Sequence, residues 1–262
     1  MTDSHAIHPD VAAGATTGRL DRAAVQCDRL IRYLESKNNV LLLTTSTRYR
    51  KHRWDVPKST QLAQRIKAHL KAKRKHVTLI DVAGLTIHTC EGNISAKRGN
   101  SCGVTDATLR DKRKNPTGLH RCWASINNAD DQLYKITRDL FRSQVVIFFV
   151  SVRWGQTNSV YQRLLERLSW IENRVTTLGE KPIAQLKKLE AGVVLFGQNW
   201  NDAAVLKVQQ QNFRWFGWKA PTPLSFCWQY TGNATDESAE SYLSAVAEFE
   251  ELVQILPPSR DP

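Results

Sequence analysis

The chain has 262 residues, of which 41% are hydrophobic and 24% charged, a composition that excludes a fibrous or wholly disordered protein. Its longest purely apolar run, Val145–Val150, is far shorter than the roughly 20 residues that span a bilayer, so no membrane span is expected. Met1–Gly18 lacks the apolar stretch of a signal peptide, and we predict a disordered leader and a cytoplasmic protein. The five irregularly spaced cysteines are predicted to be free thiols.

The net charge of +12 is unevenly distributed. Residues 48–75 carry eleven Lys or Arg and one acid, whereas residues 236–251 carry six acids and no base. Clustered cations attract anionic ligands, either a phosphate-bearing small molecule or a nucleic acid. No helix-turn-helix, zinc-finger or RNP pattern accompanies the charge, which favours the small molecule and predicts no nucleic-acid partner.

Helical spacing of apolar residues alternates along the chain with short apolar runs that are typical of buried strands. In chain order we predict a helix over 21–34, a strand at 40–43, a helix over 59–70 capped by Ser59, a strand at 77–82, a helix over 130–141, a strand at 144–150, a helix over 160–171, a strand at 192–196, a helix over 202–213, a strand at 223–228 and a helix over 242–253. Between them, Gly84–Asn128 is glycine-rich without apolar periodicity, which predicts a long insertion or lid. Residues 257–262 read as a tail.

This alternation predicts a doubly wound α/β domain over residues 19–256, with a five-stranded parallel sheet and helices on both of its faces. Such sheets bind ligands at the carboxyl ends of their strands. The residues that directly follow each strand are therefore the candidate site.

Hydroxyl groups and a cation follow the first strand. Ser46, Thr47 and Arg48, with Ser59 and Thr60 at the start of the next helix, supply donors suited to a phosphate. A capped helix after an ordinary Ser/Thr turn accounts for the same residues. Neither a P-loop nor a G-x-G-x-x-G turn is present, which disfavours an NTPase or a Rossmann dinucleotide site.

Aromatic and amide groups follow two later strands. The third strand ends in Ser151-Val152-Arg153-Trp154-Gly155-Gln156-Thr157-Asn158, and the fourth in Gly197-Gln198-Asn199-Trp200-Asn201. These residue types suit a flat heteroaromatic ring with polar edges. Alternatively, the first of these segments is a capped strand-to-helix turn in which Trp154 belongs to the core.

The hydroxyl loop 45–48, the segment 151–158 and the following Tyr161-Gln162-Arg163-Leu164-Leu165-Glu166-Arg167 resemble the flavodoxin-like NAD(P)H-dependent FMN reductases and quinone reductases. The resemblance covers about residues 38–230. It implies the strand order 2-1-3-4-5, an FMN phosphate held by Ser46, Arg48, Ser59 and Thr60, and an isoalloxazine ring flanked by residues 152–157 and 197–200. It also implies an NADPH- or NADH-dependent reductase of a small-molecule electron acceptor, and a homodimer or homotetramer.

This sequence departs from the family pattern in a longer, basic first loop and in a larger insert at residues 84–128. Reduced flavin develops negative charge near N1 and C2=O, and Arg153 is the candidate that stabilises it. Arg153 is equally consistent with a surface cation or with a carboxylate partner. A non-enzymatic flavodoxin-type electron carrier and a basic nucleic-acid-binding α/β protein remain the alternatives.

Three further groups receive structural interpretations. His88, Cys90, Cys102, His120 and Cys122 lack the spacing of a zinc site, so no metal is predicted. The aromatic segment 200–228 is expected mostly in the core or at a subunit contact, with a wall for an aromatic substrate or nicotinamide as the alternative. Glu166 and Glu172, with Arg163, Arg167 and Arg174, are predicted to form ion pairs on helix surfaces.

Overall fold

The computed structural model describes residues 18–47, 56–92, 102–197, 200–230 and 238–256. Its helices are α1 (Arg19–Glu35), α2 (Lys58–Ala72), α3 (Trp123–Asn127), α4 (Leu133–Leu140), α5 (Ser159–Leu168), α6 (Trp170–Thr176), α7 (Asp202–Trp215) and α8 (Ala239–Ile255). Its strands are β1 (Asn39–Thr44), β2 (His76–Asp81), β3 (Val145–Arg153), β4 (Gln156–Thr157), β5 (Glu190–Gly197) and β6 (Phe226–Gln229). Short 3₁₀ turns lie at residues 82–84, 105–107, 184–186 and 222–224. Residues 1–17 of the predicted leader and the predicted tail, residues 257–262, lie outside the described residues.

The strands form one sheet in the order β2-β1-β3-β5-β6, in which all of these pairs are parallel. Strand β4 lies off this path and pairs antiparallel with β3, so the sheet has six strands and not the five predicted. The extra strand arises because β3 continues to Arg153, into a segment predicted to be loop, and then reverses through a tight turn. The predicted α/β class with a parallel sheet is confirmed.

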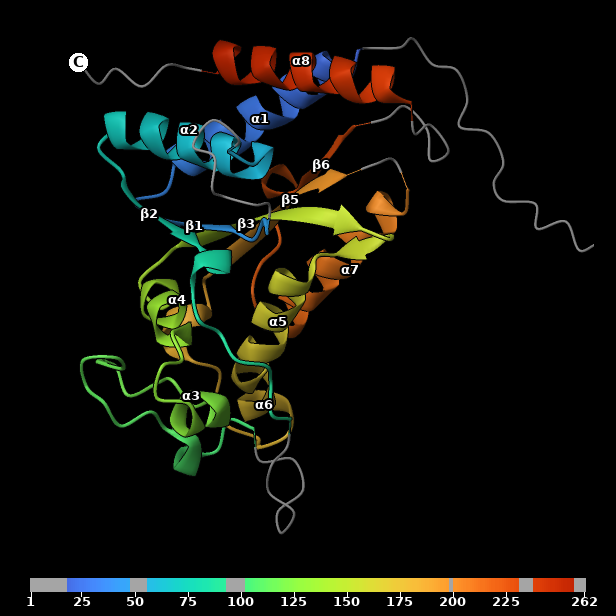
Figure 1. Ribbon diagram of the computed structural model, residues 1–262. Coiled ribbons are helices and arrows are strands. Elements are labelled where there is room, and N and C mark those ends of the chain that lie inside the picture. The colour runs from blue at the N-terminus through green and yellow to red at the C-terminus, as the bar shows by residue number, and fades with distance from the viewer. Residues whose placement is uncertain (1–17, 48–55, 93–101, 198–199, 231–237, 257–262) are drawn as a thin grey trace, which may run out of the picture.

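Helices cover both faces of the sheet (Figure 1), with α1, α2 and α8 on one face and α3 to α7 on the other. Alternate residues of a strand point into the two cores: Leu41 belongs to the core on the side of α3 to α7, and Leu42 to the core on the side of α1, α2 and α8. Both side chains are fully buried. Burial on both faces explains why the strands read as continuous apolar runs.

Two predicted helix starts are wrong. Helix α2 begins at Lys58 with Pro57 in the cap position, so Ser59 lies in the first turn and is not the cap. Helix α4 begins at Leu133, because the carboxylate of Asp131 lies in the protein interior, where it accepts a hydrogen bond from the N–H of Leu133. None of the described helices is both long and apolar enough to cross a membrane.

The described residues of the insert after β2 do not extend over the strand ends as a lid would. Its described part, residues 84–92 and 102–128, packs against α5 and α6 on the outer side of the helical layer (Figure 1). Cys102 and Cys122 are buried there, and all five cysteines of the chain are free thiols.

Candidate functional site

The carboxyl ends of β1 and β3 are joined by hydrogen bonds through Asn158. The N–H and Oγ1 of Thr45 both donate to the carbonyl of Phe149, at 3.1 and 3.2 Å. Asn158 Nδ2 then donates to Thr45 Oγ1 and to Ser151 Oγ, each at 3.0 Å. Asn158 Oδ1 accepts from the N–H of Tyr161 at 3.1 Å and caps α5. One amide therefore fixes two strand ends and one helix start.

Asn158 was included in the polar segment after the third strand, but it was not among the residues predicted to bind the cofactor. The available signal was an amide side chain placed directly before a helical apolar pattern, which is typical of an N-cap. Its bond to the end of β1 has no such signal, because Thr45 is 113 residues away in the chain.

The ends of β3 and β5 meet through two glycines. A Cβ on Gly197 would lie 2.7 Å from Cβ of Val152, so only glycine lets these strand ends approach this closely. The carbonyl of Gly155 accepts a hydrogen bond from Asn201 Nδ2 at 2.8 Å. The segments after β3 and β5, which sequence analysis predicted to flank one ring, are therefore in contact.

Strands β3 and β4 form a hairpin that turns at Trp154 and Gly155. Both turn residues have positive φ, 49° and 65°, the combination that defines a type I′ turn. Glycine adopts this conformation freely, whereas a tryptophan rarely does. Contrary to its interpretation as a core residue, Trp154 is 89% exposed. Its ring forms an edge contact with that of Trp200, with 6.1 Å between centroids and an interplanar angle of 84°.

Arg153 and Gln156 stand opposite each other across the base of this turn. Both side chains are exposed, and neither makes a hydrogen bond or ion pair with any residue that the structure describes. The hairpin therefore presents a cation, an amide and an indole ring to the solvent.

The predicted phosphate ligands lie at the end of β1 and the start of α2. Ser46 and Ser59 are 8% and 4% exposed, and Thr47 is exposed. The first turn of α2 contains no acid, so the positive end of its dipole is not neutralised from within the helix. Arg48 lies outside the described residues, as do Gln198 and Asn199 of the loop after β5.

Two of the predicted site hydroxyls are buried without a hydrogen-bond partner among the residues that the structure describes, Thr60 Oγ1 in α2 and Thr157 Oγ1 in β4. Leaving a buried polar group unpaired costs about 1–3 kcal/mol, so such atoms call for an explanation. Tyr161 and Trp170 also carry unpaired atoms, but these two residues lie in the hydrophobic core. Thr60 and Thr157 belong instead to segments that follow strand ends, where a ligand can supply the partner.

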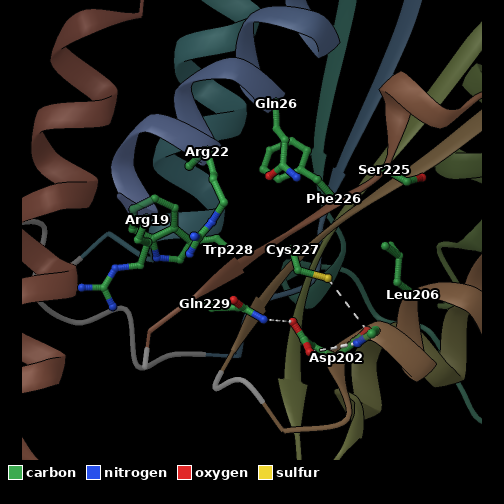
Figure 2. A pocket seen from close by; sticks show the side chains of 12 residues that line it. Arg19, Arg22, Gln26, Asp202, Leu206, Ser225, Phe226, Cys227, Trp228 and Gln229 are labelled. Carbon is green, nitrogen blue, oxygen red and sulfur yellow. Dashed lines mark hydrogen bonds between the residues drawn. The ribbon is translucent and has the colours of Figure 1, made fainter. Parts of the chain in front are cut away.

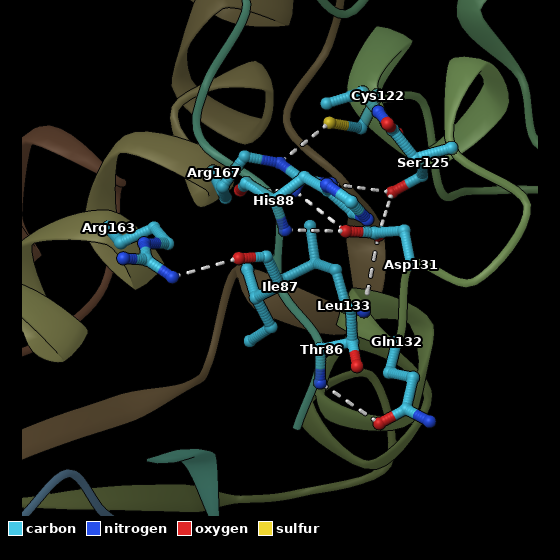
Figure 3. A network of polar contacts seen from close by, with 12 residues as sticks. Thr86, Ile87, His88, Cys122, Ser125, Asp131, Gln132, Leu133, Arg163 and Arg167 are labelled. Carbon is cyan, nitrogen blue, oxygen red and sulfur yellow. Dashed lines mark hydrogen bonds and ion pairs between the residues drawn. The ribbon is translucent and has the colours of Figure 1, made fainter. Parts of the chain in front are cut away.

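The predicted surface ion pairs of α5 and α6 are wrong for Arg167 and Arg174, because the insert covers both side chains. Arg167 is fully buried, and its two Nη atoms donate to the two carboxylate oxygens of Asp131 at 2.8 and 2.9 Å (Figure 3). It also donates to the carbonyl of His88 at 2.7 Å and to Ser125 Oγ at 2.8 Å. Arg174 pairs with Glu180 at 2.7 Å.

His120 completes this buried network, with its two ring nitrogens 2.8 Å from Thr137 Oγ1 and 2.9 Å from Ser125 Oγ. Burial, together with the charge of Arg167, lowers the pKa of His120 to about 3. Burial opposes the ionisation of Asp131, but the hydrogen bonds from Arg167 outweigh it and the pKa lies below its usual value. In the described part of the chain, no group of His, Cys, Asp or Glu is arranged to hold a metal ion.

A cavity of about 320 Å³ lies beside the edge strand β6, between α1 and the start of α7 (Figure 2). Its walls carry charges that the protein already pairs: Arg19 binds Glu248 at 2.7 Å, and Asp202 accepts from Gln229 Nε2 at 2.8 Å. None of the predicted site residues lines it, and the sequence carried no signal for it. The cavity adjoins the strand-end site without sharing a predicted residue with it, because Gln229 pairs with Gly197 and Asp202 directly follows Asn201.

No protein-family model and no curated protein sequence matches this chain. Among solved structures, RosB with a bound 8-demethyl-8-formylriboflavin-5'-phosphate intermediate is similar, with a TM-score of 0.50 and 12% identity over 83% of this chain and 75% of that one. This similarity and the strand order β2-β1-β3-β5-β6 together identify the fold. The chain has a flavodoxin-like fold.

Other structures with this fold are also similar to the chain. An azoreductase from Bacillus anthracis str. Sterne has a TM-score of 0.47 and 10% identity over 83% of this chain and 98% of that one. An apo NADH:FMN oxidoreductase, EMOB, has a TM-score of 0.42 and 10% identity over 86% and 92% of the two chains.

Proposed function

We propose that this protein is an FMN-dependent oxidoreductase that transfers hydride from NADPH or NADH, by way of bound FMN, to a quinone, a flavin or another electron-poor small molecule. The observation that carries the proposal is the joining of three strand ends at one edge of a flavodoxin-like sheet, with Thr60 and Thr157 as unpaired buried hydroxyls in segments that follow them. In open α/β sheets this edge is where ligands bind. RosB, which shares the fold, holds a riboflavin-5'-phosphate derivative.

The phosphate end of FMN would lie between the end of β1 and the start of α2. Ser46, Thr47, Arg48, Ser59 and Thr60 would provide its hydrogen-bond donors. The first-turn N–H groups of a helix bind phosphate well, and α2 carries no acid there to compete. A phosphate oxygen would also give the hydroxyl of Thr60 the partner that it lacks.

The isoalloxazine ring would lie against the ends of β3 and β5. Ser151, Val152, Gly155, Gln156 and Thr157 on one side, and Gly197, Gln198 and Asn199 on the other, would flank it. The side chain of Val152 packs directly over Gly197, where any larger residue would clash, so these two strand ends can lie close together beside the ring. The ring has carbonyl and nitrogen acceptors that the hydroxyl of Thr157 would satisfy.

When bound, FMN would accept hydride and pass electrons onward, so the protein needs to bind and orient it and requires no dedicated acid or base. The predicted role of Arg153, stabilising charge on the reduced ring, requires a site from which water is excluded. Because Arg153 is exposed, we give it another role below. The basic composition favours NADPH, which carries an additional phosphate, as the hydride donor. A homodimer or homotetramer stays a prediction.

The test is to purify the full chain, record its visible spectrum, titrate the apoprotein with FMN and measure steady-state NADPH and NADH oxidation. We expect a yellow protein that oxidises one of the two nucleotides. FMN binding without steady oxidation would indicate an electron carrier. Colourless protein that FMN neither binds nor protects from heat would overturn the proposal, and a steep salt-dependent affinity for DNA or RNA would replace it with nucleic-acid binding.

Two isosteric variants test the placement of the cofactor. Thr60→Val and Thr157→Val each remove a hydroxyl that the proposal pairs with FMN, and each should weaken FMN binding by roughly tenfold. Thr105→Val is the control, because Thr105 is exposed and lies in the insert. FMN affinity that is unchanged in both test variants would remove these contacts from the site.

A further inference from the structure

Trp154 occupies a backbone position that its side chain does not favour. The first residue of a type I′ turn has positive φ, and asparagine, aspartate or glycine is usual there. Trp154 has φ 49°, and with 89% of its surface exposed it gains little packing in return. Strained residues that the fold itself does not need are found most often at binding sites. Trp154 is thus a candidate for ligand contact.

The position of the Trp154 ring is set by a neighbouring loop. Trp200, 44% exposed, contacts it edge-on at 84°, so the two indoles form an open corner. The bond from Asn201 Nδ2 to the carbonyl of Gly155 locks the residues that follow each tryptophan, and Asn201 itself has φ 60°. A flat ring that stacks on one indole would meet the edge or face of the other, as aromatic groups prefer.

A cation lies directly beside this corner. Arg153 precedes Trp154 and faces Gln156 across the hairpin, and neither side chain has a described partner. Side chains opposite each other in an antiparallel pair lie close enough to act on one group. A guanidinium with free N–H groups binds a carboxylate or sulfonate through two hydrogen bonds.

We propose that Trp154, Trp200 and Arg153 bind the electron acceptor, and that this acceptor is a planar aromatic molecule bearing an anionic group such as a sulfonate or carboxylate. The inference rests on the proposed flavin-dependent reductase activity. It assigns the exposed corner to the molecule that must enter and leave on every turnover. The buried hydroxyls of Thr60 and Thr157 are left for the retained cofactor.

The kinetic test compares 1,4-naphthoquinone-2-sulfonate with the neutral 1,4-naphthoquinone as acceptors for the FMN-loaded protein. Trp154→Ala should raise KM for both quinones by about three- to tenfold, because it removes a stacking surface. Arg153→Gln should raise KM for the sulfonate by about fivefold more than for the neutral quinone. Trp215→Ala and Arg113→Gln are matched controls, since Trp215 is 71% exposed at the far end of α7 and Arg113 is exposed in the insert.

Retained FMN, oligomeric state and direct binding are measured alongside. Unchanged KM values in variants that retain FMN would overturn the inference while leaving the proposed function intact. Loss of FMN from Trp154→Ala would instead make the indole part of the cofactor site, and dissociation of an oligomer in that variant would make the corner a subunit contact; either result overturns the inference.

If the protein holds no FMN, calorimetric titration of the full chain with naphthalene-2-sulfonate still decides whether the corner binds such a molecule. Binding that Trp154→Ala and Arg153→Gln both weaken supports the assignment. Absence of binding, or equal binding by all variants, removes it.

Discussion

Two polar regions of the molecule differ in whether their charged side chains pair with other residues. One lies in and around the insert after β2, and the other is the hairpin at the end of β3. In the insert after β2 and its surroundings, Arg167 and Asp131 are fully buried and pair with each other. In the hairpin at the end of β3, Arg153 and Gln156 are exposed and pair with no described residue. Buried charges are kept only when the protein pairs them, so the first set stabilises the fold. The second set is left for a ligand.

The largest expected effect is at the buried pair of Arg167 and Asp131, which lies beside the insert. Asp131→Ala leaves the charge of Arg167 buried and unpaired, and should lower the free energy of unfolding by about 3–5 kcal/mol in urea titrations. Asp130→Ala is the neighbouring control, because that carboxylate is 69% exposed where it contacts His88, and it should change stability by less than about 0.5 kcal/mol.

If Asp131→Ala does not fold, Asp131→Asn keeps the shape of the side chain while removing its charge, and should be destabilised in the same direction. Equal stability of the Asp130 and Asp131 variants would mean that the insert does not depend on the buried pair.

The second prediction concerns pH. Folding lowers the pKa of His120 from 6.5 to about 3, so the unfolded chain takes up a proton first as the pH falls. The contribution that neutral His120 makes to the free energy of unfolding is fully present above pH 6.5 and is lost progressively as the pH falls toward 3. Between pH 7 and pH 5 it amounts to about 2 kcal/mol. Urea unfolding at the two pH values measures it, and pH 5 lies above the range in which Asp131 titrates.

His120→Gln is the matched variant. Glutamine retains a donor and an acceptor but does not titrate, so the difference in stability between pH 7 and pH 5 should shrink. A difference as large as that of the unsubstituted chain would assign the pH effect to other groups.

The third prediction moves to the edge of the sheet. Asn158→Ala removes the cap of α5 and both bonds to the ends of β1 and β3, and should cost about 1–2 kcal/mol of unfolding free energy. Asn158→Asp keeps the capping oxygen and should cost less. FMN binding should weaken in Asn158→Ala, because Thr45 and Ser151 lose the group that positions them. No loss in either measurement would show that the two strand ends are held by other contacts.

The smallest effect has the opposite sign. Trp154→Asn places the preferred residue before Gly155 in a type I′ turn, and should stabilise the protein by up to about 1 kcal/mol. Trp215→Asn removes an equally exposed indole from a helix, where asparagine is a weaker helix former, and should be neutral or slightly destabilising. Thermal unfolding of the two variants gives the comparison. A loss of stability in Trp154→Asn would mean that packing of the indole ring outweighs the backbone strain at this position.

Much of the fold could be predicted from periodicity, because strands buried on both faces are continuous apolar runs. The segment 144–150 was predicted as strand, but the extension of β3 to Arg153 was not. Ser151 and Arg153 interrupt its continuous apolar run, and a two-residue turn with tryptophan first does not carry the Asn-Gly signal of a hairpin. The sequence predicted at which edge of the sheet the site lies and which residue types it contains, but not the hydrogen bonds that hold those residues together.

The sequence by itself determined the alternation of strands and helices, and hence the edge at which residues 45–47 and 151–158 gather with Gly197, Trp200 and Asn201, because these follow from local hydrophobic patterning. Only the tertiary structure decided which polar groups pair with other residues of the protein and which stay exposed. Arg167 and Asp131 are 36 residues apart, and Asn201 and Gly155 are 46 apart. Whether an arginine is buried or exposed depends on which distant segment packs over it, and side-chain type and spacing along the chain do not contain that information.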